Sequence, residues 1–205
     1  RAVSFTLENA KRLGRDHRVA FHGGDVGACW PLFVRAVEFI EGAAASAGVR
    51  HRFSIGTNGY YTADQADYLA AHIHDATVSI DGVASVHDAC RVTASGGASL
   101  ARVLDTVRVF EREGVGYAIR MTVTAGSVGL LAESVAFLCE HTQARTIRAE
   151  PMYVRGRAID SVLMPPEPDE FVAAFREASA VARGFGRRLT YSGARIEAGA
   201  AAFCS

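Results

Sequence analysis

The sequence predicts an α/β fold built on a parallel β-sheet. Short β-rich runs alternate with longer amphipathic helical patterns along the 205 residues, and no low-complexity linker separates two halves. Strand–helix–strand connections cross over with one hand, so consecutive strands of this kind lie parallel. An open, doubly wound sheet and a complete or partial barrel both satisfy the pattern, and both bind ligands at the carboxyl ends of their strands.

Length and composition are those of one globular domain with a full hydrophobic core. Hydrophobic residues make up 49% of the chain and charged residues 21%, and the formal net charge is zero. A neutral chain generates no long-range field for nucleic acid or an anionic membrane, so neither partner is expected. No apolar run is long enough to predict a membrane span.

The expected elements follow one another in strand–helix order after a helical start. Strands are predicted at 17–22, 50–55, 76–80, 117–124 and 146–153, with a short sixth at 188–192. Helices are predicted at 30–47, 63–74, 99–113, 130–141 and 168–183, the second capped by Thr62. The segment between the third strand and the third of these helices is predicted to be a loop.

Polar residues and glycines follow the first two strands. Gly23-Gly24 lets a ligand approach the backbone closely, and Asp25 can pair with an ammonium group. The alternative is a tight turn with Asp25 near a helix start. After the second strand, Ser54, Thr57 and Asn58 offer polar groups to a ligand, or form a turn and cap the next helix.

The next strands also end in polar residues. Ser79 and Asp81 are two residues apart and are predicted to point to the same side, and Arg91 is a natural clamp for a carboxylate. Arg120 lies inside an apolar strand, where it either forms an ion pair with Glu150 on the next strand or binds a ligand.

The cysteines favour neither a zinc site nor a disulfide framework. Cys29, Cys90, Cys139 and Cys204 are widely spaced and form no C-x-x-C motif. Free thiols in a reducing, cytoplasmic compartment are expected. The usual nucleotide, zinc-protease and serine-hydrolase motifs are absent from the sequence.

The strand-end segments become specific when they are taken in order. FHGGD, SIGTNG, VSIDG with HD and R soon after, IRMTVT and EPMYVRGRA together resemble the radical S-adenosylmethionine (radical SAM) superfamily. Within it they resemble peptide-modifying maturases with a C-terminal SPASM or twitch auxiliary-cluster region, a group that includes the anaerobic sulfatase maturases. The resemblance runs from about residue 17 to residue 205. It implies an α/β fold in the form of a partial TIM-like (β/α)6 barrel over residues 1–197, its first strand missing upstream, with a truncated auxiliary-cluster region at 198–205.

The resemblance also implies roles for residues. Gly23 and Gly24 match the family's Gly-Gly pair, Asp25 stands in place of a glutamate and Val26 in place of a proline. Ser79 to Asp81 match the Ser-x-Asp-Gly strand end. The residues expected to bind S-adenosylmethionine are Gly23, Gly24, Asp25, Ser54, Thr57, Asn58, Ser79, Asp81, Arg91, Arg120 and Met152. No catalytic residue is assigned.

The iron–sulfur ligands of the family have no counterpart here. The C-x3-C-x2-C loop that holds the [4Fe–4S] cluster is absent and would lie upstream of Arg1. Cys204 matches the first auxiliary-cluster cysteine, a metal ligand only together with a downstream region. The chain is therefore expected to be inactive by itself.

The activity implied for the intact protein is reductive cleavage of S-adenosylmethionine. The resulting 5′-deoxyadenosyl radical would modify a peptide or protein substrate, with a flavodoxin or ferredoxin as electron donor. Two alternatives remain open. One is a cluster-less relative that binds peptides as a scaffold; the other is an unrelated β/α barrel that binds a phosphorylated metabolite at Gly23-Gly24.

Overall fold

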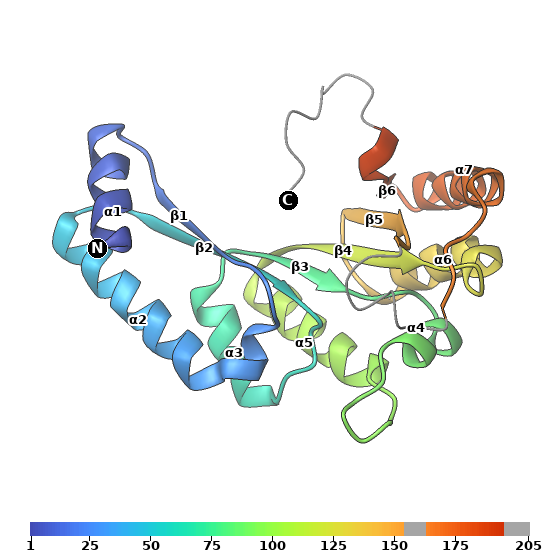
Figure 1. The fold of residues 1–205 in the computed structure, drawn as a ribbon, viewed down its shortest axis with the longest axis horizontal. Helices are drawn as coiled ribbons and strands as arrows, with labels where there is room; N and C mark the ends of the chain where they lie inside the picture. Colours follow the sequence, from blue (N-terminus) through green and yellow to red (C-terminus); the bar gives the residue numbers. More distant parts are fainter. Residues whose placement is uncertain (154–162, 195–205) are drawn as a thin grey trace. The chain divides into compact units, whose positions relative to one another are not determined.

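The strands form a six-stranded parallel α/β sheet, as the sequence predicts. A computed structural model of the chain describes residues 1–153 and 163–194 (Figure 1). The sheet order β1-β2-β3-β4-β5-β6 follows the chain. The strands are β1 (His17–Phe21), β2 (His51–Thr57), β3 (Asp75–Ser79), β4 (Gly116–Val123), β5 (Thr146–Pro151) and β6 (Arg188–Thr190).

Helices connect these strands. The α-helices are α1 (Ala2–Arg12), α2 (Trp30–Ala47), α3 (Ala63–His72), α4 (Ala84–Cys90), α5 (Leu100–Glu113), α6 (Leu131–His141) and α7 (Pro168–Gly184). Short 3-10 helices are η1 (Val26–Cys29), η2 (Val128–Leu130) and η4 (Ser192–Ala194). None of the helices in the described ranges is long and apolar enough to cross a membrane.

The chain divides into two compact units. Unit 1 comprises Arg1–Ser79 and Ser99–Tyr117, and unit 2 comprises Ile80–Ala98 and Ala118–Ser205. Unit 1 carries β1 to β3 with α1, α2, α3 and α5. Unit 2 carries most of β4, with β5, β6, α4, α6 and α7.

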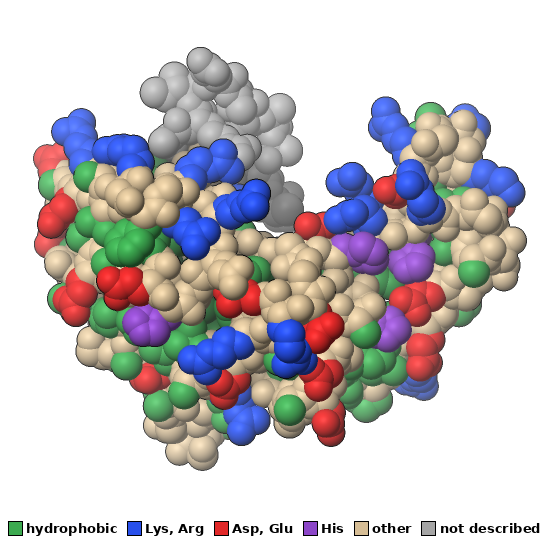
Figure 2. Space-filling model, turned by 180° about the vertical axis from the view of Figure 1, so that it is seen from behind, with side chains coloured by type: hydrophobic (Ala, Val, Ile, Leu, Met, Phe, Trp, Pro, Cys, Tyr) green, Lys and Arg blue, Asp and Glu red, His purple; other side chains and the backbone are tan. Residues whose placement is uncertain are grey.

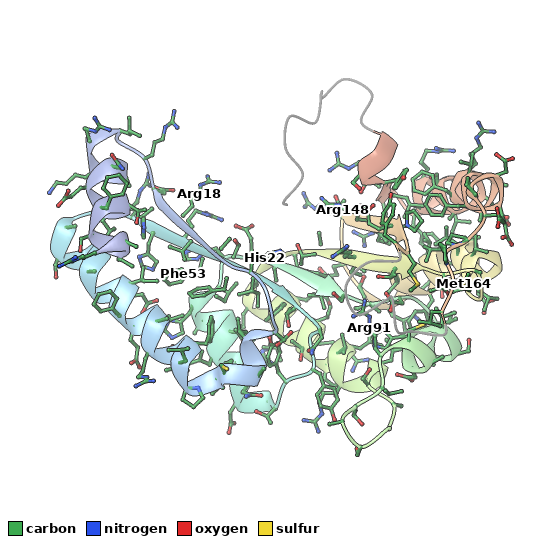
Figure 3. All side chains as sticks on the ribbon, viewed as in Figure 1. Arg18, His22, Phe53, Arg91, Arg148 and Met164 are labelled. Carbon is green, nitrogen blue, oxygen red and sulfur yellow. The ribbon has the colours of Figure 1, made fainter. Side chains whose placement is uncertain are left out.

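Side-chain alternation gives the sheet of unit 1 one apolar and one polar face. Phe53 and Ile55 of β2 are buried, whereas Arg52 and Ser54 lie on the other face and are more accessible. Phe53 lies between the sheet and α2, and Arg18 of β1 lies on the opposite side (Figure 3). The helices of unit 1 therefore cover one face of its sheet, and we call the other face the open face.

The same alternation runs through β4 and β5 in unit 2. Ile119, Met121 and Val123 are buried, and the intervening Arg120 and Thr122 lie on the open face. Helices α6 and α7 pack closely against each other, and α7 packs on β6.

Local sequence signals explain where several elements begin and end. The Thr62 hydroxyl accepts from the Gln65 N–H, and the Gln65 side chain accepts from the Thr62 N–H, which completes the capping box predicted at the start of α3. Gly48 ends α2 and Gly114 ends α5, both in the left-handed conformation that glycine adopts without strain.

Three details of the sequence prediction were wrong. The segment after β3 was expected to be a loop, but residues 84–90 form α4, a short helix without a strong sequence cap. Helix α3 ends at His72, and β3 begins at Asp75. His74, the last residue of the helix predicted at 63–74, lies between them, and its Nδ1 accepts a hydrogen bond of 3.2 Å from the Phe53 N–H.

We expect Gly82→Ala to destabilise the chain strongly. Gly82 has φ of 123°, and an added Cβ would lie 2.1 Å from Oγ and 2.2 Å from Cβ of Ser134. Backbone strain and overpacking together should lower the free energy of unfolding by about 3 kcal/mol in urea titrations. Gly42→Ala, inside α2 with nothing near the added Cβ, is the matched control and should raise it by about 0.5–1 kcal/mol. Equal stability of the two variants would contradict the packing at Gly82.

Candidate cofactor-binding site

In unit 1, the Asp25 carboxylate joins the turns that follow β1 and β2. Its Oδ1 accepts from the Gly27 N–H at 2.9 Å and the Tyr61 hydroxyl at 2.8 Å. Its Oδ2 accepts from the Thr57 hydroxyl at 2.8 Å and the Asn58 N–H at 2.7 Å. A carboxylate offers about four acceptor positions, and these four bonds use them.

Asp25 is therefore an anchor for two strand-end turns and the N-cap of η1, as the turn alternative predicted. The predicted contact of Asp25 with an ammonium group stays a prediction. Burial and the nearby Asp25 charge raise the pKa of Tyr61, so its hydroxyl stays protonated and donates to the carboxylate.

The other predicted residues of unit 1 lie around this anchor or on the open face. Gly23 has φ of 127°, and an added Cβ at Gly23 or Gly24 would meet nothing within 4 Å. Ser54 and Ser79 are half-buried on the open face of β2 and β3. The accessible backbone at Gly23-Gly24 suits a close ligand approach, and the binding role of these residues stays a prediction.

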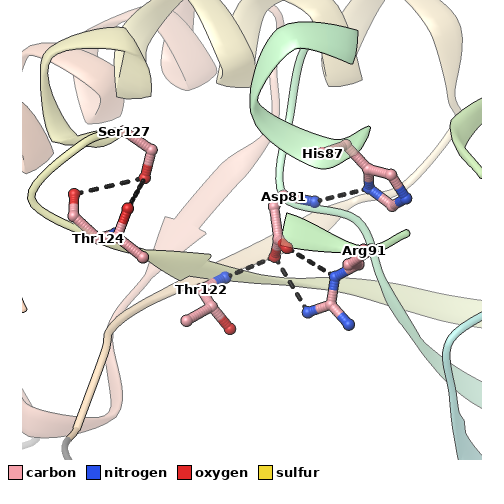
Figure 4. Close-up of polar contacts among 6 residues, drawn as sticks. All are labelled: Asp81, His87, Arg91, Thr122, Thr124 and Ser127. Atoms are coloured by element: carbon pink, nitrogen blue, oxygen red, sulfur yellow. Dashed lines mark hydrogen bonds and ion pairs between the residues drawn. The ribbon is translucent and has the colours of Figure 1, made fainter. Parts of the chain in front are cut away.

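In unit 2, a buried ion pair lies beside β4 (Figure 4). Asp81 is 3% exposed, and its carboxylate accepts from Nε of Arg91 at 2.6 Å and from Nη2 at 3.1 Å. Oδ1 of Asp81 also accepts from the Thr122 N–H at 2.8 Å. The carboxylate that Arg91 clamps is thus supplied by the chain itself, and the pair fixes the segment after β3 against β4.

His87 of α4 supports this arrangement from the other side. The Asp81 N–H donates to its Nδ1 at 3.2 Å, so the ring proton resides on Nε2 (Figure 4). The ring is fully buried, and burial lowers the pKa of His87 below its ordinary value. The sequence placed His87 in a loop and gave it no role, because only tertiary packing puts it behind Asp81.

A pocket of about 400 Å³ opens at the carboxyl ends of β4 and β5 within unit 2. It combines charged, hydroxyl and apolar groups, a mixture typical of small-molecule sites. The lining residues are Asp81, Cys90, Arg91, Arg120, Thr122, Thr124, Glu150, Pro151, Met152, Tyr153 and Leu163.

The two charged strand residues in this pocket are not paired with each other. The Glu150 carboxylate accepts from the Ser192 N–H at 3.2 Å and the Ser192 hydroxyl at 2.7 Å, and Nε of Arg148 lies 4.0 Å from it. The predicted Arg120–Glu150 ion pair does not form, and Arg120 is exposed toward the pocket. The other interpretation of Arg120, a contact with a ligand, stays a prediction.

The structure brings four of the predicted cofactor residues into one pocket: Asp81, Arg91, Arg120 and Met152. The remaining seven lie in unit 1. Thr122 and Thr124 were missed. Thr122 is two residues from Arg120 on the same face of β4, and Thr124 directly follows the last residue of the strand. Cys204, the proposed auxiliary-cluster ligand, and the region 198–205 lie outside the described residues.

The thiols and other metal-binding side chains do not gather into a site. Cys29 is exposed, Cys90 is half-buried and Cys139 is buried, and all three are free. Within residues 1–153 and 163–194, no three His, Cys, Asp or Glu side chains are placed to share a metal ion. The described residues therefore do not fit a thiolate-ligated iron–sulfur cluster.

Comparison with known proteins finds solved structures of similar fold at low sequence identity. No protein-family model and no curated protein matches the chain. Among solved structures, native anSMEcpe with bound AdoMet and Cp18Cys peptide has a TM-score of 0.73 at 16% identity over 92% of this chain and 53% of that chain. Streptococcus suis SuiB bound to S-adenosylmethionine has a TM-score of 0.62 at 15% identity over 92% and 42%.

A third neighbour is matched over nearly its whole length. A domain of pyruvate-formate lyase-activating enzyme from Bacteroides vulgatus has a TM-score of 0.60 at 14% identity over 85% of this chain and 98% of that one. The chain spans about half the length of the anSMEcpe structures. The chain thus shares its fold with these three proteins.

Asp25→Asn tests the anchor in unit 1. Each carboxylate oxygen of Asp25 accepts two hydrogen bonds, and in asparagine one of these oxygens is replaced by an NH2 group that cannot accept. Two of the four donors would therefore lose their acceptor. We expect the free energy of unfolding in urea to fall by about 2 kcal/mol. Asp64→Asn, on the exposed first turn of α3, should change it by less than about 0.5 kcal/mol. A loss for Asp25→Asn no larger than for Asp64→Asn would rule out the anchoring role.

The buried His87 should make stability fall in mild acid. Its folded-state pKa is lowered, so below about pH 6.5 the unfolded chain binds more protons and the free energy of unfolding decreases as the pH falls. His87→Gln keeps an acceptor for the Asp81 N–H without titrating. Between about pH 7.5 and 5.5, urea titrations should show the wild type losing up to about 1 kcal/mol more than the variant. Identical losses would mean that His87 is not held neutral.

Proposed function

We propose that the chain is the S-adenosylmethionine-binding core of a radical SAM enzyme that modifies a peptide or protein. The pocket of unit 2 carries this proposal. It lies at the carboxyl ends of parallel strands, where α/β folds bind their ligands, and its volume of about 400 Å³ suits a molecule of nucleoside size. Neighbours with the same fold bind AdoMet and peptides, as their names state.

The residues lining the pocket match the chemical groups of S-adenosylmethionine. Arg120, for which no ion pair is found within residues 1–153 and 163–194, offers its guanidinium to the carboxylate of the methionyl group. Glu150, although engaged by Ser192, presents a negative charge to an ammonium or sulfonium group. Met152 and Pro151 offer apolar surface to a base, and Thr122 and Thr124 can bond to ribose hydroxyls.

S-adenosylmethionine, when bound and reduced, supplies a 5′-deoxyadenosyl radical that abstracts a hydrogen atom from the substrate. The chain's own part is to bind, orient and enclose it. The Asp81–Arg91 pair keeps the pocket wall in place and leaves no uncompensated carboxylate there.

Filling the pocket should abolish binding. We expect S-adenosylmethionine to bind the chain in isothermal titration calorimetry, and Thr122→Trp to weaken binding by more than about tenfold, which corresponds to 1.4 kcal/mol. Thr146→Trp is the matched control, because Thr146 lies on the open face of β5 and does not line the pocket. Met152→Ala, which removes an apolar wall without adding bulk, should also weaken binding.

ATP serves as the ligand control, because it shares the adenosine but lacks the methionyl group. Equal affinity of the wild type for ATP and S-adenosylmethionine would refute recognition of the methionyl group. Unchanged S-adenosylmethionine binding in Thr122→Trp with a folded chain would remove the pocket from the proposal. The Gly24→Val and Ser79→Trp variants then test the predicted residues of unit 1 by the same readout.

A further inference from the structure

The open face of β4 to β6 carries an uncommon distribution of charge. These three strands contain three arginines, Arg120, Arg148 and Arg188, and one acidic residue, Glu150. Arg120 and Arg148 are partners in the parallel register, and the Thr146↔Arg188 and Arg148↔Thr190 pairs put Arg188 on the same face. We call Arg120, Arg148 and Arg188 the arginine surface.

This arrangement is unfavourable in the chain by itself. Neighbouring strands lie about 4.8 Å apart, so the Cα atoms of the register partners Arg120 and Arg148 are adjacent and both side chains leave the same face. Their like charges therefore repel each other. All three arginines are exposed. The carboxylate that could neutralise them, Glu150, is held by Ser192 and lies 4.0 Å from Nε of Arg148. Arg188 donates to the neutral Thr146 hydroxyl at 3.3 Å.

Unit 1 has a similar pair that is partly neutralised. Arg18 and Arg52 are register partners on the open face of β1 and β2, but Arg52 forms an ion pair with Asp75 of β3 at 3.1 Å. Among the described residues of unit 2, the matching compensation comes from Glu150, at the limit of ion-pair distance. The excess positive charge is therefore greater on the arginine surface.

We propose that the arginine surface binds an acidic segment of a peptide, whose Asp or Glu carboxylates pair with Arg148 and Arg188 while Arg120 binds the carboxylate of the cofactor. The inference deepens the proposed function, on which it rests, by naming the class of substrate. Planar guanidinium groups bind carboxylates through two parallel hydrogen bonds, and bound carboxylates would relieve the repulsion between the arginines.

Nucleic acid is the less favoured anion. The chain has no net charge, and acidic and basic side chains are interspersed over the lower half of the face shown in Figure 2. Arg148 lies on the side of β5 away from α7, beside the pocket that Arg120 and Glu150 line (Figure 3). A peptide at this surface would lie next to the proposed cofactor, whereas a nucleic acid duplex needs a broader basic surface.

Fluorescence anisotropy with a labelled Glu-Gly repeat peptide and the intact chain tests this inference. We expect the peptide to bind with strong salt dependence, and the Gln-Gly repeat of equal length to bind at least about tenfold more weakly. Arg148→Gln and Arg188→Gln should each weaken the Glu-Gly peptide about three- to tenfold. Arg148→Lys should lose less affinity for the Glu-Gly peptide than Arg148→Gln, because lysine keeps the positive charge although it lacks the paired donors of the guanidinium group.

Arg176→Gln is the matched control, since Arg176 is an exposed arginine on α7 and removes the same charge from the same unit. It should bind the Glu-Gly peptide like the wild type. Thermal unfolding of each variant confirms that it is folded. Equal losses in Arg176→Gln and Arg148→Gln, or equal binding of the Glu-Gly and Gln-Gly peptides, would overturn the inference.

Competition by RNA and binding of S-adenosylmethionine distinguish a failure of this inference from a failure of the proposed function. A single-stranded RNA that displaces the Glu-Gly peptide at equal concentration of negative charge would overturn the assignment to peptides. Binding of S-adenosylmethionine to the wild type without specific Glu-Gly binding would refute the inference and leave the proposed function intact. Specific Glu-Gly binding without S-adenosylmethionine binding would support the surface and refute the proposed cofactor.

Discussion

The buried carboxylate of Asp81 is the contact on which the site region of unit 2 depends. A charge that is 3% exposed is unfavourable unless every acceptor position is used, and Arg91 and the Thr122 N–H supply the donors. Because these donors come from α4's end and from β4, satisfying one carboxylate fixes two separate segments. The wall of the pocket and the orientation of the pocket-facing residues of β4 follow from that fixation.

Asp25 plays a comparable part in unit 1. Its four hydrogen bonds join the turns after β1 and β2, and they include two backbone N–H groups that strand ends leave without partners. Both units thus use an aspartate directly after a strand to hold irregular backbone in place. A carboxylate that could bind a ligand can equally accept hydrogen bonds from the chain's own donors, which is the part that Asp25 and Asp81 play in the fold.

The open face of the sheet connects structure and function. Parallel sheets are usually covered on both faces, so polar strand positions such as Arg120, Thr122 and Arg148 need a reason to persist. A cofactor pocket beside a positively charged surface provides one, since a small molecule and an acidic peptide would each satisfy groups that the chain leaves exposed. Within residues 1–153 and 163–194, no three His, Cys, Asp or Glu side chains are placed to share a metal ion, so these polar positions have no metal to bind among the described side chains.

The sequence by itself determined the order of the strands and helices, because the alternation of β-rich and helical patterns is a local property. It also determined the parallel sheet and the placement of polar residues at strand ends. The strand-end motifs indicated a fold, and the comparison with solved structures agrees with that fold. Helix α4 was missed, since a seven-residue helix with a weak cap is held mainly by the burial of His87 and Val86.

Only the tertiary structure decided which partner each polar residue takes. Arg91 was predicted to clamp a carboxylate, and the fold supplies that of Asp81. Arg120 was predicted to pair with either Glu150 or a ligand, and Glu150 binds Ser192 instead. The sequence lists the charges along the chain, but ion pairs form between the groups that the fold brings within a few ångströms. Register likewise depends on the assembled sheet, and it places Arg148 beside Arg120, which no local pattern in the sequence predicts.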